Sequence, residues 1–486
     1  ARVMPRVYDM PRPFCEEFDP EYDPDLQDEK TFIKEQIRPL VPSQDQEVCD
    51  ELVDAIIVMD HADTLGSIMQ FDLSERTRNI LQAQLQETEG QCFSTDKARK
   101  ILPYVRIILA LTEKYSALVM NPPYMGSGNM NATLSDYVKK HYKEGKADLF
   151  SVFMLLAVRR LAPNGKYGMI NMQSWMFLSS FEDLRKQLLE YEQIDSMLHL
   201  GPRTFDELSG EVVQNVAFVV SHHSPEFTGT YYRLVDGKNC ADKEKRFLTK
   251  QGEYPNVDQK KFEQIPGSPI GYWVSEKIID CISNSEEIGI AFKCREGIHT
   301  SNNEKYVRFW IEVDEKKIVF KAKNYIDIDT QGTWVPYNKG GGFRKWYGLN
   351  NYIIAFNKKY RDEMANLPFH VRPSQDLYFK EGGTWSAIGS NKFSIRYYPV
   401  GYLFDAGGQI AVGKEIVSLI GYLNSILFDY ISKLTMPTIN FKCGIIKRLP
   451  DLKVNSENVC YIIRENISLS RQDWDAHETS WDFKEN

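Results

Sequence analysis

Several features that would place the protein in a familiar class are missing from its sequence. The eight cysteines are scattered without a Cys-x-x-Cys pair, so the sequence indicates neither a zinc site nor a disulfide framework, and we expect no metal. No apolar run approaches the ~20 residues that cross a bilayer, and no secretory signal is present. These absences favour a reducing cytoplasm as the setting and no membrane partner.

Positive charge is also scarce, because 59 Lys and Arg stand against 67 Asp and Glu, giving a net charge of −8. This balance argues against a broad, non-specific nucleic-acid coat, although it leaves room for one local basic groove. No strand, Gly-x-Gly loop and helix follow one another before residue 121, which weakens an ordinary dinucleotide-binding interpretation.

The most informative feature present is Asn121-Pro-Pro-Tyr124, which follows the apolar, strand-like run 116–120. An exocyclic nucleobase amine is a poor nucleophile until its two hydrogens are hydrogen-bonded to acceptors. The Asn121 side chain and the Pro122 carbonyl can be those acceptors. Pro122 and Pro123 stiffen the loop and remove two N–H donors. Tyr124 offers a flat face for a flipped base. The alternative is a strand followed by a proline turn.

Residues 121–127 resemble motif IV of the amino-methyltransferases that modify adenine N6 in DNA. The order of the later segments is similar to the gamma type, in which a target-recognition domain follows the catalytic domain. More closely, the chain resembles the PglX methyltransferases of BREX phage-defence systems. The strings that carry this resemblance are 121–130 (NPPYMGSGNM), 174–181 (SWMFLSSF), 199–205 (HLGPRTF), 210–218 (GEVVQNVAF), 336–348 (PYNKGGGFRKWYG) and 473–483 (DWDAHETSWDF).

The resemblance implies S-adenosyl-L-methionine as cofactor, double-stranded DNA as partner, and other defence-system proteins as further partners. Asp63 falls in a segment similar to motif III, where an acid at a strand end contacts the cofactor's adenine; a helix-capping or turn role is the alternative. Asp148 and Phe150 match motif V, which together with Asn121 lines the cofactor pocket. The alternative for the aromatics around Phe150 is the core.

Two further groups of residues are candidates for contact with DNA. Trp175 and Phe177 lie where the family has residues near the target base, so either is a candidate to stack on a flipped adenine beside Tyr124; core packing is the alternative. The glycine-rich segment 337–347 carries three cations and no acid, which suits contact with phosphates. The predicted DNA-binding residues are Lys339, Arg344, Lys345, Arg295 and Arg396.

Strands and helices alternate from 116 to 200, which predicts an α/β parallel sheet to which 212–220 adds an antiparallel strand. The fold we expect is a partial Rossmann-like S-adenosylmethionine methyltransferase sheet followed by an α+β target-recognition domain. Because the glycine-rich cofactor loop is not found upstream, we expect an internal fragment of a larger protein. The expected divisions are 1–225 (C-terminal part of the catalytic domain), 226–270 (linker) and 271–486 (target recognition).

The function predicted is site-specific methylation of adenine N6 in DNA, as a host-protective modification in phage defence. Two alternatives stay open at this point. One is a type II restriction-modification polypeptide with the same core, and the other is a catalytically incomplete DNA-binding specificity module. Cytosine-N4 methylation is a chemical variant that uses the same pair of acceptors.

Overall fold

A computed structural model describes residues 29–38, 41, 45–90, 96–205, 213–222, 227–389, 392–436, 440–453 and 456–483. Residues 210–212 of the string 210–218 lie outside these ranges. The chain divides into two compact units, of which the first is Ala1–Trp175 with Ser180–Gln259 and the second is Met176–Ser179 with Lys260–Asn486. Among the described helices, none is both long and apolar enough to cross a membrane.

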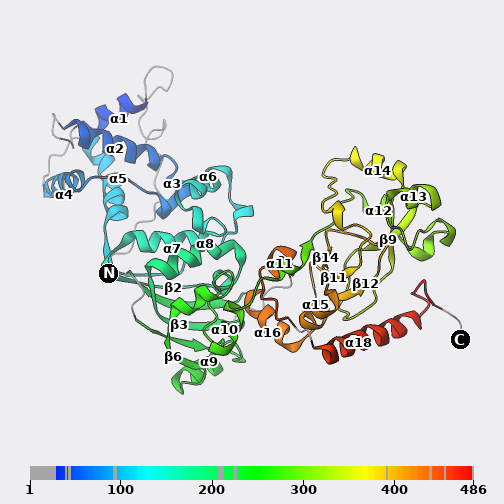
Figure 1. Cartoon of the computed structure of the whole chain (residues 1–486). Coiled ribbons are helices and arrows are strands. Elements are labelled where there is room, and N and C mark those ends of the chain that lie inside the picture. Colours follow the sequence, from blue (N-terminus) through cyan, green and yellow to red (C-terminus); the bar gives the residue numbers. More distant parts are fainter. Residues whose placement is uncertain are drawn as a thin grey trace. The chain divides into compact units, whose positions relative to one another are not determined.

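The first unit is built on a six-stranded mixed sheet in the order β1-β2-β4-β3-β5-β6 (Figure 1). β1 runs parallel to β2 and β3 runs parallel to β5, whereas β4 is antiparallel to both of its neighbours. The predicted antiparallel strand is thereby confirmed. The strands are β1 (Tyr115–Met120), β2 (Leu161–Met172), β3 (Gln193–Gly201), β4 (Asn215–Ser221), β5 (Gly229–Arg233) and β6 (Glu253–Val257).

Helices α7 (Leu149–Arg160) and α8 (Glu182–Tyr191) pack against β2 and β3, and Figure 1 shows them over one face of the sheet. Each connects two parallel strands, as a crossover helix must. α6 (Ala132–His141) precedes α7 and begins at Asn131, whose side chain accepts a hydrogen bond from the Leu134 N–H. The alternation predicted between 116 and 200 is therefore present.

A helical region precedes the sheet. In α5 the side chains of Ile101, Val105, Ile108 and Leu109 are all buried, so these residues form an apolar face of the helix. The helices of this region are α1 (Glu29–Ile37), α2 (Gln46–Met59), α3 (Ala62–Leu65), α4 (Glu75–Gly90) and α5 (Asp96–Thr112).

β1 forms one edge of the sheet. Among the described residues its backbone pairs with β2 alone. Its side chains are largely uncovered, and Val119 is 90% exposed. A central strand of a parallel sheet would instead be buried on both faces.

The predicted linker at 226–270 is wrong over residues 229–257. β5 pairs with β3, β6 pairs with β5, and α9 (Cys240–Leu248) connects the two strands. Tyr231 on β5 is fully buried. The polar, turn-rich sequence did not predict these short strands, because strands near a sheet edge need little apolar surface. The division between the units falls after Gln259.

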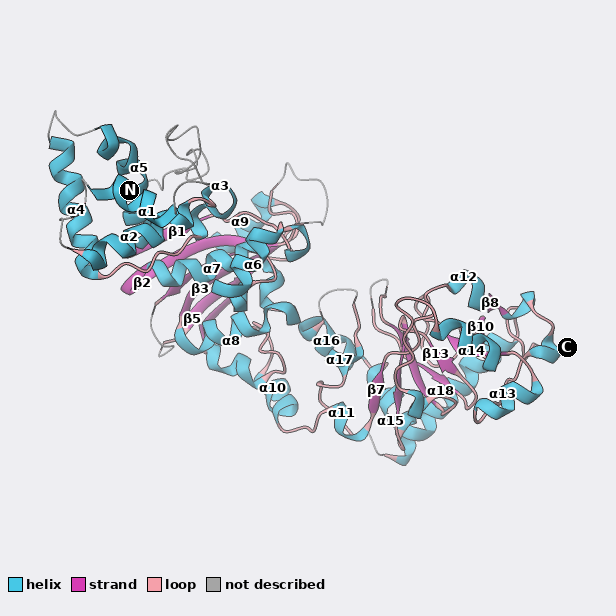
Figure 2. Cartoon of the chain, turned by 90° about the horizontal axis from the view of Figure 1, so that it is seen from above, coloured by secondary structure: helices cyan, strands magenta, loops and turns pink. Residues whose placement is uncertain are grey.

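The second unit contains two four-stranded sheets, in the orders β13-β9-β10-β8 and β12-β11-β14-β7 (Figure 2). Two buried clusters lie in this unit, one around Phe356 and one around Phe393, and the second sheet contributes residues to both. The strands are β7 (Lys293–Arg295), β8 (Val307–Phe309), β9 (Trp334–Asn338), β10 (Tyr352–Ala355), β11 (Gly382–Ser386), β12 (Arg396–Tyr398), β13 (Leu403–Phe404) and β14 (Gly408–Val412). The helices of eight or more residues are α10 (Glu276–Ser283), α14 (Lys358–Ala365), α15 (Ile416–Leu423), α16 (Ile426–Thr435) and α18 (Glu457–Asp475).

Candidate active site

The Asn121-Pro-Pro-Tyr124 loop begins at the carboxyl end of β1. In open α/β sheets, ligands bind beyond the carboxyl ends of the strands. Asn121 is exposed, the ring of Pro122 is buried, and the side chain of Tyr124 is 43% exposed. The loop is therefore anchored at Pro122 while its two polar side chains face outward.

Asp148, the N-cap of α7, fixes the path of the chain just after this loop. Its Oδ1 accepts hydrogen bonds from the Phe150 N–H (3.2 Å) and from the Met125 N–H (3.1 Å). Two backbone hydrogen bonds add to the connection, Leu149 N–H to the Met125 carbonyl (2.9 Å) and Ser127 N–H to the Ala147 carbonyl (3.0 Å). The segments predicted to resemble motifs IV and V thus lie against each other.

The loop presents two acceptors. Among the described residues, no donor is bonded to the carbonyl of Pro122. The Oδ1 of Asn121 accepts only a long contact of 3.5 Å from the Tyr124 hydroxyl, at the limit of a hydrogen bond. Both oxygens can therefore accept hydrogens from an incoming amine without first losing a strong bond.

Tyr124 stands next to the buried ring of Phe150, edge to face, with 6.2 Å between ring centroids. Phe150 packs in turn on Phe181 at 5.4 Å. Partial burial raises the pKa of the Tyr124 phenol, and the Asn215 side chain opposes this with a smaller effect. The phenol therefore stays protonated at neutral pH.

Asn215 is a site residue that the sequence interpretation did not single out, although it lies in the string 210–218. It is buried at the start of β4, and its Nδ2 donates to the Asn171 carbonyl at 3.4 Å. Its Oδ1 has no hydrogen-bond partner among the described residues. A buried, unpaired amide oxygen costs free energy unless a ligand or water satisfies it.

Trp175 and Phe177 do not offer a free ring face to a base. Trp175 has no exposed surface: it packs on Phe218 and donates its Nε1–H to the Asn171 Oδ1 at 3.0 Å. Phe177 is 6% exposed and belongs to the second unit, where it packs on Trp273. The stacking prediction for these two residues is corrected to core packing. Trp175 holds the side chain of Asn171, whose backbone carbonyl accepts the hydrogen bond from Asn215.

Asp63 lies in the first turn of the short helix α3 and is exposed, not at the end of a strand. The strand that the motif III resemblance implied is therefore not formed here. The alternative that the sequence left open was a helix-capping or turn aspartate. The N-cap of α3 is His61, and Asp63 lies in the first turn, where a carboxylate is favoured by the helix dipole.

Arg344, predicted to contact DNA, is bonded to the protein. Its guanidinium donates to the carbonyls of Tyr347 (2.7 Å) and Ser470 (3.2 Å) and to the Asp473 carboxylate (2.6 Å), and it lies over the Trp474 ring. The strings 336–348 and 473–483 thus meet, and Arg344 attaches the glycine-rich loop to α18.

The other two cations of this loop are also engaged within the protein. Lys345 donates its Nζ–H to the Asn424 carbonyl at 2.7 Å. Lys339 is 3.9 Å from the Asp405 carboxylate and its side chain is only a quarter exposed. Phosphate contact through these side chains would require them to leave their present partners.

Arg396 and Arg295 have opposite environments. Arg396 is 3% exposed on β12, and burial, with a smaller contribution from Arg344, lowers its pKa to about 10. It therefore cannot reach DNA in this arrangement, and the prediction for Arg396 is corrected. Arg295 at the end of β7 is exposed, so its predicted contact with DNA stays a prediction.

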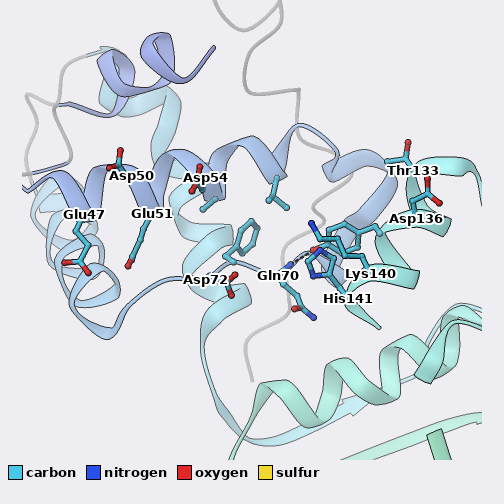
Figure 3. Close-up of a pocket in the computed structure, with 14 residues that line it drawn as sticks. Glu47, Asp50, Glu51, Asp54, Gln70, Asp72, Thr133, Asp136, Lys140 and His141 are labelled. Atoms are coloured by element: carbon cyan, nitrogen blue, oxygen red, sulfur yellow. Dashed lines mark hydrogen bonds between the residues drawn. The ribbon is translucent and has the colours of Figure 1, made fainter. Parts of the chain in front are cut away.

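A cavity of about 750 Å³ lies elsewhere in the first unit, between α2 and α6 (Figure 3). It contains none of the residues predicted for catalysis or cofactor binding. Six carboxylates line it, against Lys140 and His141, so it disfavours phosphate-bearing ligands. These acids are Glu47, Asp50, Glu51, Asp54, Asp72 and Asp136.

Residues 53–205, which include the Asn121 loop, Asp148 and Trp175, match the family model of the Eco57I restriction-modification methylase.

Over most of its length the chain is also similar to two curated relatives. One is the adenine-specific methyltransferase PglX of Lacticaseibacillus casei (strain Zhang), 38% identical over 87% of this chain. The other is the adenine-specific methyltransferase BrxX of Escherichia coli O9:H4 (strain HS), 35% identical over 90% of this chain. The resemblance predicted from the six strings is confirmed.

The chain spans a little more than a third of the length of these relatives, 37% and 36%. Among solved structures, it is similar to the type IIL restriction-modification enzyme MmeI in complex with DNA, with a TM-score of 0.44 and 10% identity. That match covers 93% of this chain and 67% of the other. A TM-score below 0.5 does not establish a shared fold, so the sequence relatives carry the comparison.

Proposed function

We propose that this chain supplies the amine-activating loop and the recognition unit of an S-adenosylmethionine-dependent DNA adenine-N6 methyltransferase of the PglX type. The observation that carries the proposal is the pair of acceptors on Asn121 and Pro122, held at the end of β1 by the Asp148 contacts. The mixed sheet is part of a Rossmann-like methyltransferase domain. The modification is host-protective and belongs to phage defence, with other defence proteins as partners.

The mechanism follows from the positions of these side chains. A flipped adenine stacks on Tyr124, which is 43% exposed and supported from behind by Phe150. Asn121 Oδ1 and the Pro122 carbonyl accept the two N6 hydrogens. The amine nitrogen becomes tetrahedral and its lone pair is localised, because both acceptors are in place before the base arrives. The loop's contribution is thus orientation and polarisation.

S-adenosylmethionine would supply the methyl group as a sulfonium. Two residues fit the side that accepts the methyl group: Tyr124, which follows β1, and Asn215 at the start of β4, whose Oδ1 has no partner among the described residues. The Oδ1 of Asp148 accepts hydrogen bonds from two backbone N–H groups, so we assign Asp148 the role of positioning the loop. Phe150 forms the aromatic wall.

Double-stranded DNA is the proposed substrate, and the second unit is the proposed recognition domain. Arg295 is its exposed predicted cation. The loop held by Arg344 also presents Phe343, which is 50% exposed and is a candidate to contact bases directly.

The test is Asn121→Ala in the full-length protein. Removing one acceptor should lower the methylation rate by about 100-fold or more while duplex affinity changes less than about two-fold, because Asn121 acts on the amine and not on the DNA backbone. Incorporation of labelled methyl groups measures the first quantity, and fluorescence anisotropy the second. Asn129→Ala is the matched control, since this exposed asparagine has no side-chain partner among the described residues. Methylation by Asn121→Ala near the wild-type rate would contradict the proposal.

A further inference from the structure

A second cavity of the first unit, of about 280 Å³, is lined by four cations that the proposed mechanism does not use. We name it the basic pocket and define it by Arg78, Lys114, Arg159 and Arg160. Arg78 lies on α4, Lys114 precedes β1, and the two adjacent arginines end α7. Asp72 is the one carboxylate among the lining residues, so four positive charges stand against one negative charge.

Arg160 is the buried member of the group, with 6% of its surface exposed. Its Nη2 donates to the backbone carbonyls of Met69 (3.2 Å) and Ser67 (3.5 Å). Its Nη1 has no partner among the described residues, and the same is true of the Nε of Arg78. Backbone carbonyls neutralise no charge, so Arg160 is a buried cation without a counter-ion, which is unfavourable.

The remaining cations leave the excess charge in place. Lys114 donates to the Arg159 carbonyl, and Arg159 donates to the His141 carbonyl at 2.6 Å and lies over the Tyr142 ring. Among the described residues, none of the four cations forms an ion pair. Burial and the charges of Arg160 and Arg78 lower the pKa of Lys114. The dipole of α7 stabilises the two cations in its last turn. It does not explain why Arg78 and Lys114 lie in the same pocket.

We propose that the basic pocket binds a phosphate group. Guanidinium groups bind phosphate through two parallel N–H donors. In the part of the chain that the structure describes, the Nη1 of Arg160 and the Nε of Arg78 have no hydrogen-bond partner. The volume of the basic pocket lies just below that of pockets that bind drug-sized ligands, which suits a small anion. The pocket is separate from the active site: the six residues of β1, at about 3.3 Å each, place Lys114 about 20 Å from the Asn121 loop. The phosphate is either free or part of a DNA backbone.

The first experiment titrates the 486-residue chain into inorganic phosphate and follows the phosphorus resonance by NMR. The variant is Arg78→Gln with Lys114→Gln, because Lys114 is exposed and Arg78 is half-buried, whereas the buried Arg160 is left intact to preserve folding. The control is Lys358→Gln with Arg464→Gln, two exposed cations of the second unit. We expect saturable line broadening for wild type and control, and binding about ten-fold weaker for the variant. Absence of saturable broadening, or equal binding by the variant, would overturn the proposal.

The second experiment identifies the source of the phosphate. If it belongs to DNA, a duplex oligonucleotide displaces inorganic phosphate. The slope of the variant's duplex affinity against salt concentration then falls by the amount expected for about two lost phosphate contacts. If it is free, the duplex leaves it bound and the variant binds duplex as wild type does. Both outcomes support the pocket as a phosphate site. Neither requires methyl transfer, so failure of the proposed function would not be mistaken for failure of this one.

Discussion

At the scale of single residues, His199 is a side chain that the fold keeps uncharged. It lies near the carboxyl end of β3, is 4% exposed, and contacts the Gln173 Oε1 through Nε2 at 2.8 Å. Burial lowers its pKa to about 3, and the positive charges of Arg233 and Lys243 act in the same direction. The imidazole therefore serves as a neutral donor to Gln173 throughout the physiological pH range.

This environment predicts a pH dependence of stability. Because the pKa of His199 is lower in the folded state than its ordinary value of 6.5, the unfolded chain takes up the proton first as the pH falls. Its contribution is complete above pH 6.5 and is lost toward about pH 3, by at most about 1.4 kcal/mol per pH unit. Urea unfolding between pH 7 and pH 4 measures the loss. His199→Gln should flatten the curve, whereas His61→Gln, at an exposed position, should not; parallel curves for all three proteins would contradict the assignment.

The sequence predicted the residues of the Asn121 loop because their chemistry is local. Four consecutive residues after a strand carry both acceptors and the stacking face. The partners of Arg344 and Trp175 are not local: Asp473 is 129 positions from Arg344, and Phe218, which packs on Trp175, lies on β4. A cation in a glycine-rich segment predicts a phosphate contact only when no carboxylate from a distant segment reaches it first.

At the scale of elements, the amino end of α7 is the part that holds the active-site loop. Asp148 serves both segments with one oxygen atom, so its contribution exceeds that of an ordinary helix cap. Asp148→Ala should lower the free energy of unfolding by about 1–2 kcal/mol, and Asp148→Asn by less, since an amide oxygen still caps. The urea midpoint measures this change, with an unaltered dependence on urea concentration.

The control for the cap is Asp136→Ala on α6, an exposed acid whose contact with Lys139 is 3.5 Å long. Such a surface pair contributes little. Equal midpoints for Asp148→Ala and Asp136→Ala would mean that the α7 contacts do not stabilise the loop.

Elements with strong periodicity were predictable from the sequence. The strands around 116–120, 167–172 and 194–200 and the apolar face of α5 follow from short-range pattern. β5 and β6 do not, because their pairing with β3 and with each other is decided by neighbours 21 or more positions away in sequence. The predicted linker failed for this reason, because a polar, turn-rich composition does not exclude short strands that pair with distant segments.

At the scale of the whole molecule, the chain has two compact units, so we expect two calorimetric unfolding transitions. Arg344→Gln should lower only the transition of the second unit, by about 5 °C, because the charged side chain holds the loop to α18 through several hydrogen bonds. Asp148→Ala should lower only the other transition. Arg464→Gln, an exposed arginine on α18, is the matched control. A single transition that shifts with both variants would contradict the division into units.

Among the residues that the structure describes, β1 is paired along one side only, and this has a consequence for how the chain behaves in concentrated solution. A strand with one row of free N–H and C=O groups is a template on which another molecule can add a strand. The largely exposed Val119 adds an apolar contact to that edge, where soluble proteins usually place a lysine or a proline. Self-association of this chain at high concentration should therefore begin at β1. A charged residue at position 119 would be the smallest change that improves its solubility.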